Sequence, residues 1–184
     1  MKSIFLTLCL VSLLLASQTS FEYKEPKPVK YVSPKNFSGL WYEIARTYNK
    51  FEENCVAATV EYKQLEDNKL KVFNRCFQYE IGGELISYNG IVEPQLEDNL
   101  AVLDKTYYWI FTKEYRIIYL DKSYQTAIMS DKKMQNLWIM HRNPFMEEKK
   151  LNKLIKFIDN YMDTSKLIFT KQDKNGRYKW KKKD

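Results

Sequence analysis

The 184-residue sequence is poor in the side chains that usually bind metals or carry out acid–base catalysis. It contains one histidine, His141, and three cysteines, too few nitrogen and sulfur ligands for a typical zinc site. We therefore expect no metal. Glu43 could be taken for a general acid, but no histidine or second carboxylate is placed to form a catalytic pair with it. These shortages argue against an enzyme, and we expect no cofactor.

The sequence also lacks a hydrophobic run long enough to cross a membrane. Its longest run, from Ile4 to Ala16, has thirteen residues, whereas a spanning helix needs about 20. The run follows Lys2 and precedes small and polar residues, which is the pattern of a secretory signal. We predict that residues 1–20 are a signal peptide, cleaved between Ala16 and Phe21. The mature protein is then soluble and either secreted to the extracellular space or periplasmic.

Basic residues exceed acidic ones by a net charge of +7, but the excess is uneven. Residues 173–184 form a tail with six cations and two anions, interleaved with Tyr178 and Trp180. A solvated chain end is the simpler interpretation. The alternative is peripheral contact with an anionic membrane, to which each cation near the surface would contribute about 1 kcal/mol. We expect no nucleic-acid binding, because the basic patch belongs to a secreted protein.

The sequence pattern of the rest of the mature chain predicts a short lead-in followed by one all-β domain. Residues 21–35 are rich in Lys, Glu and Pro and show neither regular period, so they predict a flexible lead-in that could cover one rim. Residues 36–172 show strand periodicity with turn residues between the segments. The predicted strands are Trp41–Tyr48, Val56–Lys63, Leu70–Gln78, Leu85–Pro94, Leu100–Phe111, Tyr115–Asp121, Gln125–Ser130 and Leu137–Arg142. Eight antiparallel strands in sequence favour an up-and-down barrel, whose closure leaves no open edges.

The apolar period changes from two to three and four after the last of these strands. Lysines occupy the other faces of the segment 147–162, in which apolar residues recur at intervals of three and four: Leu151, Leu154, Ile155, Ile158, Tyr161 and Met162. This pattern predicts a C-terminal amphipathic helix. We expect the helix to pack on the barrel wall, and a membrane-surface helix is the alternative. Residues 166–171 would form a last short strand.

Three motifs occur in a fixed order along this predicted barrel. They are GLWYEIAR at residues 39–46, LDKSY at 120–124 and LWIMHRNP at 137–144. The first resembles the opening Gly-x-Trp-Tyr strand of lipocalins, the second their Thr-Asp-Tyr loop, with Leu120 where Thr is usual, and the third their Arg-x-Pro strand end. The chain is therefore similar to the lipocalin family from about residue 36 to 172, and it most resembles the bacterial and apolipoprotein D-like members.

The resemblance implies structural roles for the motif residues. A Trp at the start of the first strand can stack with an Arg at the end of the last one, which would contribute roughly 0.5–2 kcal/mol. In lipocalins this pair plugs the narrow end of the cup. We therefore assign structural roles at the closed end to Gly39, Trp41, Asp121, Tyr124 and Arg142.

Two cysteines remain once the signal peptide is removed. Cys55 and Cys76 lie on either side of a predicted hairpin, on neighbouring strands, in a compartment that permits disulfides. Many bacterial lipocalins resemble this chain in carrying cysteines at both places, so we predict a disulfide. Bacterial relatives are often lipid-anchored through a cysteine at the cleavage site. Cys9 follows Leu8 inside the apolar run, so we expect no such anchor here.

The ligand-binding residues should be those that point into the cup. Trp41 points inward if it plugs the floor, so the period of two adds Glu43 and Ala45. Arg142 points inward as well, so the same period of two along the last strand adds Met140 and Trp138 to the predicted lining. Alignment with family strands adds Ala58, Val60, Tyr62, Asn74, Tyr88, Gly90, Val102 and Tyr119. This lining is mostly apolar and aromatic, although one β-bulge would invert a strand.

We therefore predict a carrier of one small hydrophobic ligand, since an eight-stranded barrel is just wide enough to hold one. The resemblance implies fatty acids, lysophospholipids, sterols or pigments as ligands, and the subgroup suggests a lipid. One alternative is a lipocalin-fold enzyme that acts on a lipid or pigment. A second is a protein-interaction module that uses the aromatic segment 107–111, which could equally be strand core or a ligand portal. We expect a monomer or a weak dimer.

Overall fold

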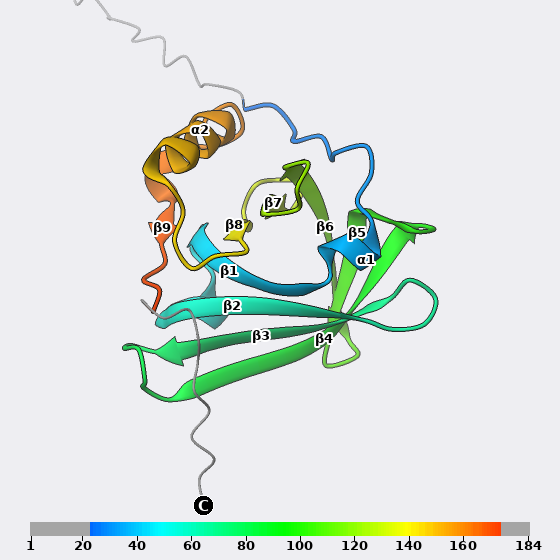
Figure 1. Ribbon diagram of the computed structural model, residues 1–184, viewed down its shortest axis with the longest axis horizontal. Coiled ribbons are helices and arrows are strands. Elements are labelled where there is room, and N and C mark those ends of the chain that lie inside the picture. Colours follow the sequence, from blue (N-terminus) through cyan, green and yellow to red (C-terminus); the bar gives the residue numbers. More distant parts are fainter. Residues whose placement is uncertain (1–22, 174–184) are drawn as a thin grey trace, which may run out of the picture.

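Eight antiparallel strands close into a barrel, as the sequence predicts (Figure 1). The computed structural model describes residues 23–173. The predicted signal peptide and nearly all of the basic tail lie outside the described residues. The strands are β1 (Gly39–Arg46), β2 (Cys55–Gln64), β3 (Leu70–Gln78), β4 (Leu85–Leu96), β5 (Asn99–Tyr107), β6 (Phe111–Leu120), β7 (Thr126–Ser130) and β8 (Leu137–His141).

The barrel closes through β1, which pairs with strands from both ends of the sheet. Residues Gly39 to Tyr42 pair with β2, and from Tyr42 onward the strand pairs with β8. A short ninth strand, β9 (Ile168–Phe169), lies against the end of β1. Each barrel strand thus has a partner on both sides, which removes the open edges.

The helix α2 (Glu148–Ile158) packs on the barrel wall, as predicted. Its buried residues Leu154 and Ile158 lie in one apolar cluster with Ile44 and Ile139 of the barrel. Short 3-10 turns, η1 (Lys50–Glu52) and η2 (Thr164–Lys166), precede β2 and β9. In the part of the chain that the structure describes, no helix has the length and apolar character needed to cross a bilayer.

The lead-in crosses the barrel end before the first strand (Figure 1). Val32 is fully buried, and its carbonyl accepts a hydrogen bond from Leu100 N at 2.9 Å. Val29 N donates to Ile117 O at 2.8 Å. A short helix, α1 (Pro34–Phe37), follows. The apolar side chains of this segment complete the core at the closed end. Because they follow no regular period along the sequence, a search for strand or helix periodicity does not predict these contacts.

Trp41 and Arg142 stack at the closed end. The Arg142 guanidinium carbon lies 3.7 Å from the centre of the Trp41 ring. Trp41 is fully buried, and its indole nitrogen donates to Phe37 O at 2.8 Å. Arg142 also donates to the carbonyl oxygens of Leu40, Asn36, Phe37, Ser38 and Tyr124 at 2.7–3.2 Å. Burial lowers the pKa of Arg142 to about 10, so the side chain stays cationic at neutral pH.

The other motif residues make contacts that stabilise the same closed end of the barrel. Gly39 has a φ of +98°, and a Cβ there would lie 3.3 Å from the Arg142 Nη1 atom, so a side chain would be strained and crowded. Asp121 accepts hydrogen bonds from the backbone of Gln125 and from Lys150 of α2. The Tyr124 hydroxyl accepts one from Ser33 N. These contacts join the loop, the helix and the lead-in.

The predicted disulfide between Cys55 and Cys76 is present and joins β2 to β3, with the two Cα atoms 5.4 Å apart. Both cysteines are buried beside Ala58. The link fastens the start of β2 to the far end of β3.

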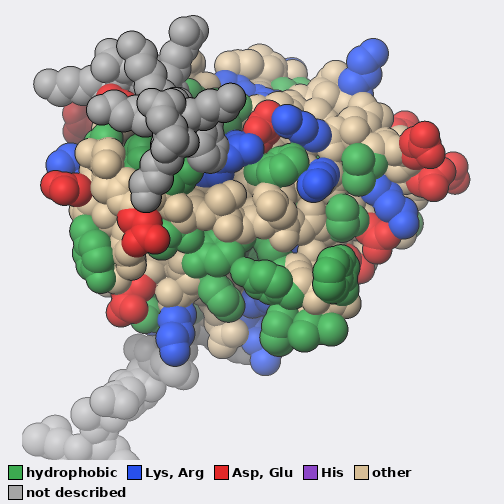
Figure 2. Space-filling model, turned by 90° about the horizontal axis from the view of Figure 1, so that it is seen from below, with side chains coloured by type: hydrophobic (Ala, Val, Ile, Leu, Met, Phe, Trp, Pro, Cys, Tyr) green, Lys and Arg blue, Asp and Glu red, His purple; other side chains and the backbone are tan. Residues whose placement is uncertain are grey.

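The aromatic segment after β5 forms a turn, so the prediction of one strand from Leu100 to Phe111 is wrong. β5 ends at Tyr107 and β6 begins at Phe111. Tyr108 and Trp109 adopt positive φ values of 52° and 63°, which reverse the chain. The Trp109 side chain is 94% exposed and Ile110 is 75% exposed. Figure 2 shows that the surface carries groups of exposed hydrophobic side chains.

Candidate functional site

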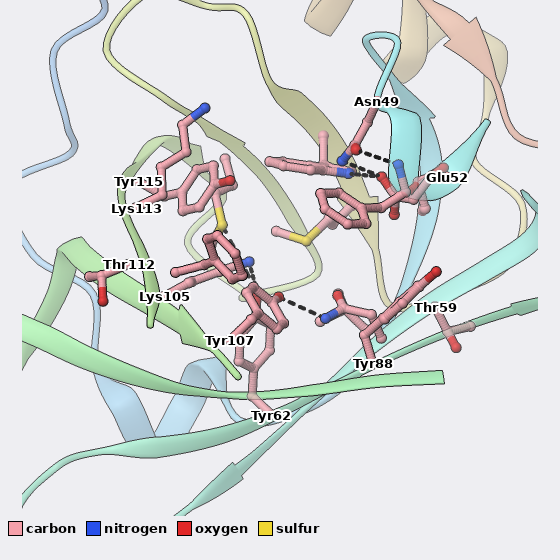
Figure 3. Close-up of a pocket in the computed structure, with 18 of the residues that line it drawn as sticks. Asn49, Glu52, Thr59, Tyr62, Tyr88, Lys105, Tyr107, Thr112, Lys113 and Tyr115 are labelled. Atoms are coloured by element: carbon pink, nitrogen blue, oxygen red, sulfur yellow. Dashed lines mark hydrogen bonds between the residues drawn. The ribbon is translucent and has the colours of Figure 1, made fainter. Parts of the chain in front are cut away.

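A cavity of about 490 Å³ opens inside the barrel, at the end opposite the Trp41–Arg142 pair (Figure 3). Most of its wall is aromatic or aliphatic. The aromatic lining consists of Tyr62, Tyr88, Tyr107, Tyr108, Tyr115 and Trp138, with Phe51 and Phe111 near the mouth. Polar groups reach the cavity at a few points only, which is the composition of a typical pocket for a small organic molecule.

The structure places seven of the twelve predicted ligand-binding residues around this cavity. They are Glu43, Val60, Tyr62, Asn74, Tyr88, Trp138 and Met140. For Glu43, Trp138 and Met140, counting by two along the strand predicted the inward face correctly. For the other four residues, alignment with family strands did so. Their part in ligand binding stays a prediction.

Two of the other five residues face away because a β-bulge shifts the register. Ala45 follows a shift between Glu43 and Ala45 in the pairing of β1 with β8. Tyr119 follows a shift between Ile117 and Tyr119 in β6, and its ring lies 5.9 Å from that of Phe157 in α2. Both residues pack in the apolar cluster beneath the helix. The prediction that they line the cup is wrong.

Ala58 and Val102 are also not among the residues that line the cavity. In β2 the register shifts between Val56 and Thr59, and Ala58 packs against the disulfide. In β5 the buried residues Leu103 and Lys105 alternate with Val102 and Asp104, which are only partly buried, so Val102 lies on the opposite face from Lys105. The prediction fails for Ala58 because it lies where the register of β2 shifts, and for Val102 because alignment with family strands put it on the wrong face.

Gly90 contributes space rather than a contact. It pairs with Tyr107 across β4 and β5, and a Cβ at Gly90 would lie 2.9 Å from the Tyr107 Cδ1 atom. The absence of a side chain therefore makes room for the Tyr107 ring. Tyr107 in turn accepts a hydrogen bond from the Asn74 side chain at 2.8 Å. Gly90 is not itself part of the cavity wall, contrary to the prediction.

Lys105 is the lining residue that the sequence least suggests. It lies on β5, is 6% exposed, and donates through Nζ to the Tyr62 hydroxyl oxygen at 3.0 Å. Burial lowers the pKa of the Lys105 ammonium, and nearby Tyr107 and Glu52 partly oppose that effect. Lysine is almost never fully buried without a partner. A prediction of the cavity lining from apolar positions in the sequence therefore omits Lys105.

The loop between β1 and β2 brings a second charged group to the mouth. Glu52 of η1 accepts hydrogen bonds from the Asn49 side chain and from the Trp138 indole nitrogen, both at 3.1 Å. Phe51 beside it is exposed, and its ring meets that of Tyr88 edge-on at 6.1 Å. These residues lie in a loop without strand periodicity, so no sequence pattern indicates that they line the cavity.

Glu43 is held in a buried ion pair. Arg46 donates to its carboxylate at 3.1 Å, and the Thr170 hydroxyl donates to the same oxygen. Burial raises the pKa of Glu43, with a smaller upward contribution from Glu52, and Arg46 opposes that rise. Through these hydrogen bonds, Glu43 holds β1 against the segment around β9.

Cys55 and Cys76 offer no nucleophile, because both sulfur atoms are in the disulfide. In the described part of the chain, the alternative of a lipocalin-fold enzyme therefore has no free thiol to act through. The cavity offers a largely aromatic and aliphatic wall with a few charged groups, of which Lys105 and Glu43 are buried.

Comparison with known proteins identifies the family. Residues 32–172 match the model of the lipocalin-like domain. The chain is 30% identical over 180 residues to the outer membrane lipoprotein Blc of Vibrio cholerae, covering 94% of this chain and 99% of that protein. It is 32% identical over 142 residues to a lipocalin of Acanthamoeba polyphaga mimivirus, covering 73% and 81%.

Solved structures show the same fold at lower identity. Insecticyanin from the tobacco hornworm Manduca sexta superposes with a TM-score of 0.67 at 17% identity, covering 84% of this chain and 88% of that one. Lobster apocrustacyanin A1 gives a TM-score of 0.61 at 19% identity, covering 77% and 80%. With the barrel, the Trp41–Arg142 pair and the matched domain, the chain belongs to the lipocalin family.

Proposed function

We propose that this lipocalin binds one small hydrophobic ligand in its cavity and carries it outside the cytoplasm, and that the ligand is a fatty acid or a lysophospholipid-like lipid. The cavity of about 490 Å³ with its aromatic lining is the observation that carries the proposal. Pockets for small molecules commonly span about 300–1,000 Å³. Each methylene transferred from water into such a wall contributes about 0.8 kcal/mol, so a lipid chain gains affinity with length.

The proposed location rests on the N-terminal sequence and on the relatives. Proteins similar to this chain are described as outer membrane lipoproteins. We propose that residues 1–20 are a cleaved signal peptide, that 21–35 form the lead-in, and that 36–172 form the ligand-binding domain. For the basic tail, 173–184, a solvated chain end is the simpler proposal, and contact with an anionic membrane surface is the alternative.

The first experiment is to purify the mature protein gently from its own compartment, extract it with organic solvent, and identify the extracted molecules by mass spectrometry. We expect about one lipid per chain. Replacing Tyr88 by Arg should weaken binding of that lipid at least about tenfold, because it puts an unpaired charge into the apolar mouth. Quenching of tryptophan fluorescence measures the affinity.

Ser87→Arg is the matched control. Ser87 is exposed and precedes Tyr88 on β4, so its side chain points to the outer face. We expect this variant to bind as the unchanged protein does. A protein that is empty on purification, and whose fluorescence does not respond to a panel of lipids, would contradict the proposal.

A second candidate function is contact between two copies of the chain through the β5–β6 turn. Its Tyr108, Trp109, Ile110 and Phe111 side chains are all more than half exposed, an unusual density of large apolar groups on a surface. If this turn mediates a dimer, Trp109→Ser should shift the sedimentation coefficient to that of a monomer. Phe145→Ser, at another exposed aromatic residue, should not. A chain that is already monomeric at high concentration would contradict this candidate.

A further inference from the structure

The charged groups that line the cavity differ in whether they have partners. Lys113 pairs with Asp131 at 2.8 Å, and Glu43 pairs with Arg46. Lys105 has no such partner: among the described residues, no carboxylate lies within 4.0 Å of its Nζ atom. Burial of a charge without an opposite charge is costly, and proteins seldom retain it without a use.

The surroundings of the Lys105 ammonium are polar on one side only. Tyr62 accepts its one hydrogen bond within the described part of the chain. The Nζ atom also lies 5.2–5.6 Å from the ring centres of Tyr62, Tyr115 and Trp138. Such rings attract a cation but accept no strong hydrogen bond. Since an ammonium has three N–H donors, two remain for a molecule in the cavity.

Lys105 also marks the inner end of the cavity on its strand. The β5 residues of the lining are Lys105 and Tyr107, and Tyr107 lies next to the turn at the mouth. Leu103, two residues further toward the closed end, is fully buried in the main apolar core. In Figure 3, Lys105 and Tyr62 are joined by their hydrogen bond within the ring of lining side chains.

We propose that the Lys105 ammonium binds the anionic head of the ligand, so that the cavity selects lipids with an acidic head over neutral ones and holds them head-inward. The inference rests on the proposed lipid-carrier function and deepens it. A carboxylate or monoester phosphate would accept the two free N–H donors and supply the missing negative charge. A neutral lipid leaves the buried ammonium without that charge, a mismatch that disfavours binding strongly.

The tail of such a lipid would extend toward the mouth. Aromatic side chains predominate there, with Phe51 and Tyr88 in edge contact and Tyr108 in the turn, and Glu52 is a charged group at the mouth. This arrangement gives the ligand an ionic contact at depth and apolar contacts along its chain, which matches a single-chain acidic lipid.

The test compares two lipids that differ only in the head. The full-length mature protein is stripped of lipid and titrated at neutral pH with oleate and with oleyl alcohol, followed by isothermal calorimetry. We expect oleate to bind at least about tenfold more tightly, a difference of about 1.4 kcal/mol. In Lys105→Met the preference should disappear, because oleate loses its ionic partner while the alcohol no longer leaves an ammonium unmatched. Lys71→Met, on the exposed outer face of β3, removes the same charge and should retain the preference.

The outcomes separate this inference from the proposed function. If both lipids bind equally well to the unchanged protein, or if Lys105→Met keeps the preference, the carrier function stands and the role of Lys105 is overturned. If neither lipid binds, both are overturned. The comparison in the unchanged protein needs no variant, so it decides the question even if Lys105→Met folds poorly.

The head-inward orientation has its own measurement. Brominated fatty acids quench tryptophan over short distances, and Trp138 lies beside Lys105. In a Trp109→Phe protein, which removes the exposed tryptophan at the mouth, bromine next to the carboxyl group should quench more strongly than bromine at the chain end. The reverse order would show a tail-inward ligand and contradict the proposal.

Discussion

Replacing Arg142 by methionine is expected to lower the free energy of unfolding by about 3 kcal/mol. The change removes the stacking on Trp41, worth about 0.5–2 kcal/mol. It also leaves five backbone carbonyl groups without their charged donor, and hydrogen bonds to charged groups contribute about 1.5–3 kcal/mol each before compensation by water. Methionine keeps most of the apolar stem, so the loss reports on the guanidinium. Urea unfolding followed by circular dichroism measures it.

Arg116→Met provides the matched control for this prediction. Arg116 lies on β6 and pairs with Glu25 and Glu114, whose side chains are 53% and 40% exposed. Water can replace such partners, and exposed ion pairs contribute only about 0–1 kcal/mol. We therefore expect a clearly smaller loss. Equal losses in the two variants would show that the closed end has no special dependence on Arg142.

Reduction of the Cys55–Cys76 disulfide is expected to destabilise the protein by about 3 kcal/mol. The bond closes a loop with a sequence separation of 21 residues, and cross-links of this size restrict the unfolded chain by roughly that amount on the chain-entropy account. The urea midpoint should therefore fall when a reducing agent is present. The folded barrel should persist, because β2 and β3 also pair along most of their length.

The double variant Cys55→Ala and Cys76→Ala controls for effects of the reducing agent itself. Its midpoint should lie near that of the reduced protein and should not respond to further reductant. A midpoint that is the same in oxidised and reduced protein would contradict the prediction.

The sequence predicts the closed end of this barrel better than the open end, for a physical reason. Trp41 and Arg142 must meet in one geometry to seal the core, so residue types and spacing there are narrowly restricted. The cysteines are similarly restricted by the need to reach each other. Motifs of this kind can be found in a single sequence, and both predictions are confirmed.

The lining of the cavity is less predictable because it depends on register. Ala45 and Tyr119 each follow a β-bulge, where one extra residue reverses the face of the side chains that follow, and Ala58 lies inside such an irregularity. No distinctive residue type marks these positions in the sequence. Lys105 is not predicted for a different reason. Lysine is typical of the protein surface, whereas the position of Lys105 on β5 directs its side chain into the barrel.

The closure of the barrel through β1 determines when this fold can be completed. Arg142 contacts carbonyl groups more than 100 positions earlier in the chain, and β1 pairs with both β2 and β8. Such distant contacts form slowly, because the intervening chain must first be ordered. During synthesis, one edge of β1 therefore waits unpaired until β8 has emerged, and the final step of folding joins the beginning of the domain to its end.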